Sequence, residues 1–151
     1  MTDGMLREIE AFFHDYADAV AKDDFDQIAA LHHVPCLKAH GTSDTIDCLQ
    51  SHDSVRDFFR DLSARYKTRG LRPGRFADLE VTPIGGLAAL ATLTWEQPGD
   101  DGVIARRSRR SYTMVRRRNG WLIMAAIGHR PPDVFSPLQD EHRNAASEGG
   151  G

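Results

Sequence analysis

The sequence has only two cysteines and no long apolar run, and each scarcity excludes a class of protein. Cys36 and Cys48 are too few for the disulfide framework that stabilises small secreted domains. The longest uncharged apolar run, residues 84–94, is far shorter than the roughly 20 residues of a membrane-spanning helix. The amino-terminal residues have neither a basic start nor an apolar segment. We therefore expect no secretory signal, no membrane partner and a cytoplasmic location.

Acidic residues are missing from residues 103–131, a stretch that is rich in arginine. Seven arginines lie between Arg106 and Arg118, and residues 67–130 carry a formal charge of +7 against −7 for residues 1–66. This asymmetry is typical either of a nucleic-acid surface or of a basic sheet covered by acidic helices. Adjacent side chains on a strand point to opposite faces, and the net charge is −3, so we expect no nucleic-acid partner. The arginines are then expected to pair with the helices, the tail or a second subunit.

The length of 151 residues is typical of one domain. A chain of this size buries enough surface to fold without a disulfide or a structural metal. Hydrophobic residues make up 40% and charged residues 27%, which is a globular composition. We expect one α+β domain over residues 1–130 and an extended or disordered tail over residues 131–151, where three prolines precede three final glycines.

The first part of the chain has helical periodicity. Apolar residues recur at spacings of three and four over residues 5–21, which predicts an amphipathic helix. Asp24 is a suitable N-cap for a second helix, which must end before Pro35. Ser51 is a suitable N-cap for a third helix that ends at Gly70.

After residue 74 the apolar period changes from helical to alternating, which indicates strands. Short strands are also expected between the second and third helices, so the predicted strands cover residues 36–40, 45–49, 77–82, 87–97, 103–117 and 121–129. Helices followed by a four-stranded meander predict an α+β fold, with N-terminal helices covering a curved, cone-shaped antiparallel sheet. The interior of such a cone is apolar and suits a small molecule.

Several landmarks in this order of elements resemble a known family. They are the run Ala-Lys-Asp-Asp-Phe-Asp-Gln-Ile at residues 21–28, the pair Phe58-Phe59, and Asn119-Gly120-Trp121. Residues 5–129 thereby resemble the nuclear-transport-factor-two-like superfamily, in particular its SnoaL-like branch. The resemblance implies the cystatin-like cone fold. It leaves the activity open, because the superfamily includes isomerases, dehydratases, cyclases, hydrolases and transport adaptors.

Comparison with the ketosteroid isomerases of that superfamily implies two catalytic residues. Tyr16 matches the tyrosine that stabilises the developing enolate, and His40 stands where the family has an aspartate that moves the proton. A histidine with a pKa of about 6.5 is a competent base near neutral pH. The family's second aspartate has no counterpart, and Tyr112 is the nearest donor on that strand. Alternatively, Tyr16 is a core residue and His40 a strand-end residue.

The expected cavity is lined by aromatic side chains and by the end of the last strand. The predicted ligand-binding residues are Phe12, Phe13, Phe59, Tyr112 and His129. Arg107 and Arg109 are further candidates, because arginine recognises carboxylate or sulfate groups. The sequence leaves open which face of their strand points inward. Trp95 and Trp121 are expected to pack against the sheet.

Histidines and cysteines gather in one short segment, which raises the alternative of a metal site. The residues are His32, His33, Cys36, His40, Cys48 and His52. Their spacings match no familiar structural-zinc pattern. We expect neither a metal nor a cofactor.

The sequence supports two functional hypotheses. The first is a small-molecule-binding SnoaL-like protein that acts as an isomerase, cyclase or lyase through proton transfer by Tyr16 and His40. The second is a non-catalytic ligand-binding or dimerisation module of the same fold. In both, a small hydrophobic molecule occupies the cone, and a homodimer forms through the uncovered face of the sheet.

Overall fold

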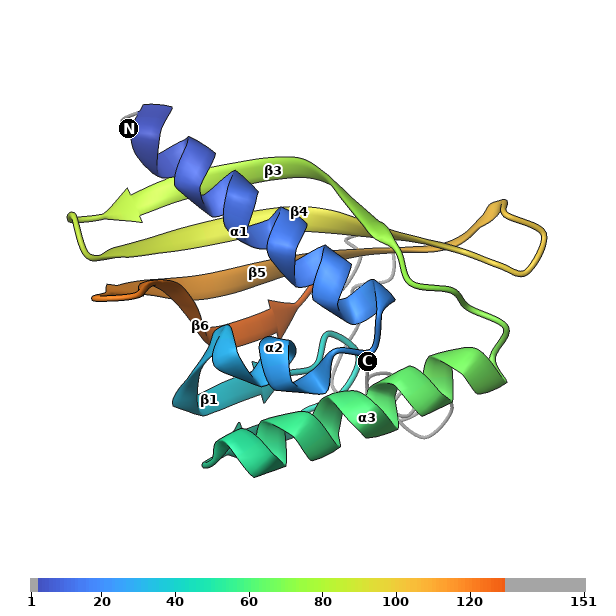
Figure 1. Cartoon of the computed structure of the whole chain (residues 1–151). Coiled ribbons are helices and arrows are strands. Elements are labelled where there is room, and N and C mark those ends of the chain that lie inside the picture. Colours follow the sequence, from blue (N-terminus) through green and yellow to red (C-terminus); the bar gives the residue numbers. More distant parts are fainter. Residues whose placement is uncertain (1–2, 130–151) are drawn as a thin grey trace.

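The computed structural model describes residues 3–129 and follows the predicted order of helices and strands (Figure 1). The elements are α1 (Asp3–Ala21), α2 (Phe25–Ala30), β1 (His32–Ala39), β2 (Ile46–Leu49), α3 (His52–Thr68), β3 (Arg75–Ile84), β4 (Ala88–Pro98), β5 (Ile104–Arg117) and β6 (Gly120–Gly128). The tail expected at residues 131–151 lies outside the described residues.

The six strands form one curved sheet in the order β2-β1-β6-β5-β4-β3. β3, β4, β5 and β6 pair antiparallel in sequence order, which is the predicted meander. β1 and β2 also pair antiparallel, whereas β1 and β6 run parallel. The sheet is therefore antiparallel except at the one place where the first and last strands meet.

Local sequence signals begin the second and third helices. The Asp24 carboxylate accepts a hydrogen bond from the backbone N–H of Gln27 at the start of α2. Ser51 and Ser54 exchange side-chain-to-backbone hydrogen bonds of 3.1 and 3.0 Å at the start of α3, which is a capping box. α3 ends before Gly70, whose φ of 71° is a backbone conformation that glycine adopts without steric cost. Both predicted N-caps are confirmed.

β1 begins at His32, four residues earlier than the strand predicted from the sequence. Proline stops a helix and also lacks the N–H that a sheet needs, so Pro35 was expected to precede the strand. In the structure the pairing with β6 shifts between His32 and Leu37, and Pro35 lies inside this irregular segment. A break in the ladder accommodates a residue that has no hydrogen to donate.

The core lies between α1 and the concave inner face of the sheet. Ile9 and Phe13 of α1 are fully buried, as are Leu93 of β4 and Met114 of β5. Figure 1 shows α1 crossing the sheet diagonally, while α2 and α3 lie near the end of the sheet that contains β1. The carboxyl end of α1, α3 and the inner faces of β4 and β5 thereby surround a common space.

Candidate functional site

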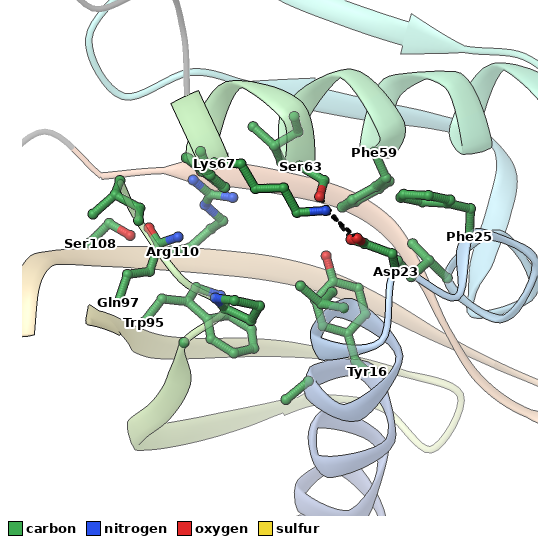
Figure 2. A pocket seen from close by; sticks show the side chains of 18 of the residues that line it. Tyr16, Asp23, Phe25, Phe59, Ser63, Lys67, Trp95, Gln97, Ser108 and Arg110 are labelled. Atoms are coloured by element: carbon green, nitrogen blue, oxygen red, sulfur yellow. Dashed lines mark hydrogen bonds and ion pairs between the residues drawn. The ribbon is translucent and has the colours of Figure 1, made fainter. Parts of the chain in front are cut away.

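A cavity of about 100 Å³ occupies the space between α1, α3, β4 and β5 (Figure 2). Much of its wall is apolar and includes Phe25, Ile28, Phe59, Leu62 and Trp95. An engineered cavity of about 150 Å³ in another protein binds benzene, so a single ring is the right scale of occupant. A cavity therefore lies inside the curved sheet, where the sequence predicts an apolar interior.

The register of β5 decides which arginine reaches this cavity. Ser108, Arg110 and Tyr112 alternate along β5 and line the cavity. Arg107 and Arg109 point the other way, where they form ion pairs of 2.9 and 3.1 Å with glutamates of β4 and β3. The inward-pointing face of β5, which the sequence left undetermined, is therefore the one that includes Arg110.

Arg110 lies among three tyrosines. It donates hydrogen bonds to the hydroxyls of Tyr66 and Tyr112. Burial alone would lower the pKa of Arg110, but Tyr112, Tyr66 and Tyr16 outweigh this effect and raise it. The guanidinium therefore keeps its charge at every physiological pH. A fixed cation in an apolar wall is suited to hold an anionic or partly negative oxygen.

The pKa of Tyr66 is lowered by two neighbouring arginines. Burial acts to raise the pKa of its phenol, but Arg110 and Arg106 outweigh burial and lower the pKa. Arg106 donates a 3.0 Å hydrogen bond to the Tyr66 hydroxyl and a 3.3 Å hydrogen bond to Gln97. Tyr66 and Gln97 both line the cavity, so its polar end is a connected network.

Tyr16, to which the resemblance assigns a catalytic role, lines the cavity. It rises from α1 into the cavity, with its hydroxyl turned toward Asp23 (Figure 2). Its ring lies 5.9 Å from Trp95 and 6.2 Å from Phe59. Burial raises the pKa of Tyr16 well above its ordinary value, so the hydroxyl stays protonated and can donate a hydrogen bond. The catalytic role of Tyr16 stays a prediction.

A polar cluster forms the side of the cavity between α1 and α3. Asp23 follows α1 with a φ of 52°, and its carboxylate accepts hydrogen bonds from Ser63 at 2.8 Å and from Lys67. The hydrogen bond from Lys67 lowers the pKa of Asp23. All three residues line the cavity (Figure 2).

His40 and His129 lie elsewhere. Nε2 of His40 is 2.9 Å from a carboxylate oxygen of Asp47. His40 is not one of the residues that line the cavity in the part of the chain that the structure describes. The His129 ring is 2.7 Å from the hydroxyl of Ser111, which alternates with Arg110 and Tyr112 and so lies on the outer face. The functional roles assigned to both histidines stay predictions.

The four aromatic residues predicted to bind ligand divide into two pairs. Phe59 and Tyr112 line the cavity. Phe12 and Phe13 pack behind it, with their rings 5.1 Å apart and the Phe13 ring 5.0 Å from Tyr112. Phe12 and Phe13 therefore support the wall from the core side.

Sequence reasoning did not select Arg110, Tyr66 or Gln97, and it assigned Trp95 to packing. Trp95 both lines the cavity and donates a 2.7 Å hydrogen bond to the Tyr112 hydroxyl. The available signal was the two-residue spacing between Arg110 and Tyr112, because alternate strand residues share a face. Using it required knowing that Tyr112 points inward.

The histidine–cysteine segment does not converge on a metal site within residues 3–129. No group of three or more His, Cys, Asp or Glu side chains in this part of the chain could hold a metal ion. Cys36 is buried and Cys48 is exposed, and both are free thiols. No helix within the same range is long and apolar enough to cross a membrane.

Solved structures define the class of this fold. The fold is similar to that of an NTF2-like protein with a cystatin-like fold from Novosphingobium aromaticivorans, with a TM-score of 0.67, 14% identity, and coverage of 89% of this chain and 86% of that one. Aln2 from a Streptomyces species is similar with a TM-score of 0.69, 14% identity, and coverage of 86% and 93%. A domain with a cystatin-like fold from Nostoc punctiforme is similar with a TM-score of 0.65 and 14% identity. The match covers 99% of this chain and 98% of that one. The protein therefore has the cystatin-like fold of NTF2-like proteins.

A family model narrows this assignment. Residues 7–131 match the family described as NTF2-like protein (DUF6841), so the chain belongs to that family. No curated protein matches the chain. The resemblance seen in the sequence is confirmed at the level of the superfamily and the fold.

Proposed function

We propose that this protein binds a small molecule with one ring and an acidic or enolisable oxygen, in the manner of SnoaL-like proteins. The observation that carries this proposal is the Arg110 guanidinium in an otherwise largely apolar, aromatic cavity. The ring would pack between Tyr16, Phe59 and Trp95, and the oxygen would accept hydrogen bonds from Arg110.

The same arrangement suits proton-transfer chemistry of the isomerase, cyclase or lyase type. Removal of a proton next to a carbonyl group develops negative charge on the carbonyl oxygen. A charged Arg110 and a protonated Tyr16 would stabilise that charge. His40 is the base proposed from the resemblance.

A non-catalytic binding module is the alternative, and the position of His40 favours it. His40 is held by Asp47 and does not belong to the described cavity wall. A binding module needs no base that converges with Tyr16, whereas an enzyme needs at least two converging titratable groups. Tyr16→Phe and His40→Gln separate the two, because an enzyme loses turnover in both variants, whereas a binding module has no turnover to lose.

Benzoate and benzamide provide the test of ligand binding. They have the same shape, and only benzoate carries a charge that pairs with Arg110. A charge-assisted hydrogen bond is worth about 1.5–3 kcal/mol, so we expect benzoate to bind roughly 10- to 100-fold more tightly. Isothermal titration calorimetry measures both dissociation constants. Equal affinities, or binding of neither compound, would refute the proposal.

We also propose that two copies associate through the outer face of the sheet. Leu90, Thr113, Ala125 and Leu37 form one cross-strand row over four strands. Leu37, Leu90 and Ile127 are exposed on this face, whereas the helices pack against the other. A second copy would cover this apolar row. The cytoplasmic location expected from the sequence stays a prediction.

A further inference from the structure

Lys38 is a lysine on the inner face of β1, and the proposed function does not use it. Its side chain is only 6% exposed, and Cys36, two residues earlier on the same face, is 2% exposed. A lysine at such a position is unusual, because burial of a charged ammonium is costly unless a partner compensates for it. The groups that contact the Lys38 amine therefore determine its charge state.

The partner of Lys38 is a histidine whose tautomer is fixed. Nδ1 of His32 lies 2.7 Å from the Ile28 carbonyl oxygen, to which it must donate its hydrogen. Nε2 of His32 is then an acceptor, and Lys38 Nζ donates to it at 2.9 Å. His32 is 1% exposed, and burial lowers its pKa well below the ordinary value, so it stays neutral. The lysine is oriented by a group that carries no charge.

The sheet register places Lys38 beside the cavity. Lys38 pairs with Ala126 of β6, and Ala126 pairs with Tyr112 of β5, so the three residues form one cross-strand row. Lys38 Nζ also lies 5.0 Å from the ring centre of Phe59, which lines the cavity. The amine is thus directly behind the cavity wall.

The charges around Lys38 favour a neutral amine. Burial lowers its pKa to about 7, and Arg110 adds to this effect while Cys36 opposes it. His32, the histidine that accepts the hydrogen bond from the amine, remains uncharged at neutral pH. A substantial fraction of Lys38 is therefore a free base at neutral pH.

We propose that Lys38 is a proton acceptor of the cavity, which takes a proton from an enolisable carbonyl compound or a phenol bound there, and that His32 positions it. The Nζ lone pair forms the new N–H bond, and the electron pair of the broken C–H or O–H bond stays on the ligand as an oxygen anion facing Arg110. The resulting ammonium returns the proton to the ligand at the same or another atom. Contact requires the Phe59 side chain to rotate aside. This proposal rests on the proposed cavity ligand.

Reductive methylation tests Lys38 with a probe that is independent of that ligand. The chain has only three lysines, and Lys22 and Lys67 are exposed and ion-paired with aspartates. At pH 7, formaldehyde with a mild borane reductant methylates only the neutral amine. We expect methylation of Lys38 to be at least 10-fold faster than that of either other lysine, by mass spectrometry of peptides. Slower methylation of Lys38 would overturn the proposal.

Protection by ligand links the amine to the cavity. Saturating benzoate should slow methylation of Lys38 at least fivefold and leave that of Lys22 unchanged, whereas Lys67 is no control because it lines the same cavity. Bound benzoate without protection of Lys38 would overturn the proposal while leaving the cavity ligand intact. Absence of benzoate binding, measured separately by calorimetry, would refute the cavity ligand, and the methylation rates alone would then decide whether Lys38 is the reactive amine.

The role of His32 has its own readout. His32→Phe removes an acceptor that stabilises the charged form of Lys38, so the midpoint of the methylation pH profile should move to lower pH. A merely structural role for His32 would leave that midpoint unchanged in the folded variant. Circular dichroism establishes that the variant is folded.

Discussion

At the scale of single residues, the inner face of the sheet has basic side chains whose charge states differ. Arg110 stays charged, because the neighbouring tyrosines outweigh its burial. Lys38, on the same concave face, has a pKa of about 7, since burial dominates and Arg110 repels its charge. One group is a permanent cation and the other exchanges a proton near neutral pH, which are the two properties that enolate chemistry requires.

The lowered pKa of Lys38 predicts how stability depends on pH. Between about pH 7 and pH 10 the unfolded chain holds a proton on Lys38 that the folded chain lacks, so stability rises with pH. The slope contributed by this one group is at most about 1.4 kcal/mol per pH unit. Lys38→Met should therefore flatten the increase in the free energy of unfolding between pH 7 and pH 9, measured by urea denaturation. Lys22→Met is the control, and an equal slope in wild type and Lys38→Met would contradict this prediction.

Residue-scale prediction from the sequence succeeded where a periodic pattern was strong. Helical spacing indicated that Tyr16 and Phe59 point inward, and both line the cavity. Arg110 was not found, because the direction of a strand residue depends on which neighbouring strands cover each face. Lys38 was missed for a different reason: a charged residue in a short strand is ordinarily solvent-exposed.

At the scale of elements, local signals determined most boundaries, whereas long-range pairing determined the rest. Capping residues gave the starts of α2 and α3, and alternation gave the four meander strands. β1 was predicted four residues too late, because its first residues pair with β6, about 90 positions later in the chain, around a proline. No local pattern reveals such a pairing.

The capping box of α3 predicts the cost of its loss. Ser51→Ala removes the acceptor for the Ser54 backbone N–H, so we expect the free energy of unfolding to fall by about 1 kcal/mol. Ser51→Asp keeps an N-cap acceptor and should retain nearly all of the stability. Urea denaturation at pH 7 measures both variants. Equal losses in the two would show that the hydrogen bond is not the cause.

At the scale of the whole molecule, the uneven charge of the sequence has a structural explanation. Three of the six arginines of β5 pair with glutamates, namely Arg116 with Glu8 of α1, Arg109 with Glu80 of β3 and Arg107 with Glu96 of β4. The expected pairing with acidic helices therefore holds for α1, and neighbouring strands supply the other partners. Arg110 lies on the face opposite to Arg107 and Arg109 and lines the cavity.

The outer face of the sheet predicts the oligomeric state. If two copies pack through the row that contains Leu90 and Leu37, a charge there must separate them. We expect the wild type to sediment as a dimer and Leu90→Lys as a folded monomer. Leu87→Lys is the matched control, because Leu87 is an exposed leucine in the β3–β4 turn. A monomeric wild type in sedimentation velocity would contradict the proposed dimer.

The proposed function requires that Arg110 hold an anionic oxygen of a ligand in the cavity. The affinity of Arg110→Gln for benzoate tests it most directly, with Arg109→Gln as the control, since Arg109 lies on the opposite face of the same strand. Calorimetric titration should show that Arg110→Gln binds benzoate at least 10-fold more weakly and binds benzamide as the wild type does, while Arg109→Gln retains wild-type affinities. Unchanged benzoate affinity in a folded Arg110→Gln variant would refute the proposed role of Arg110.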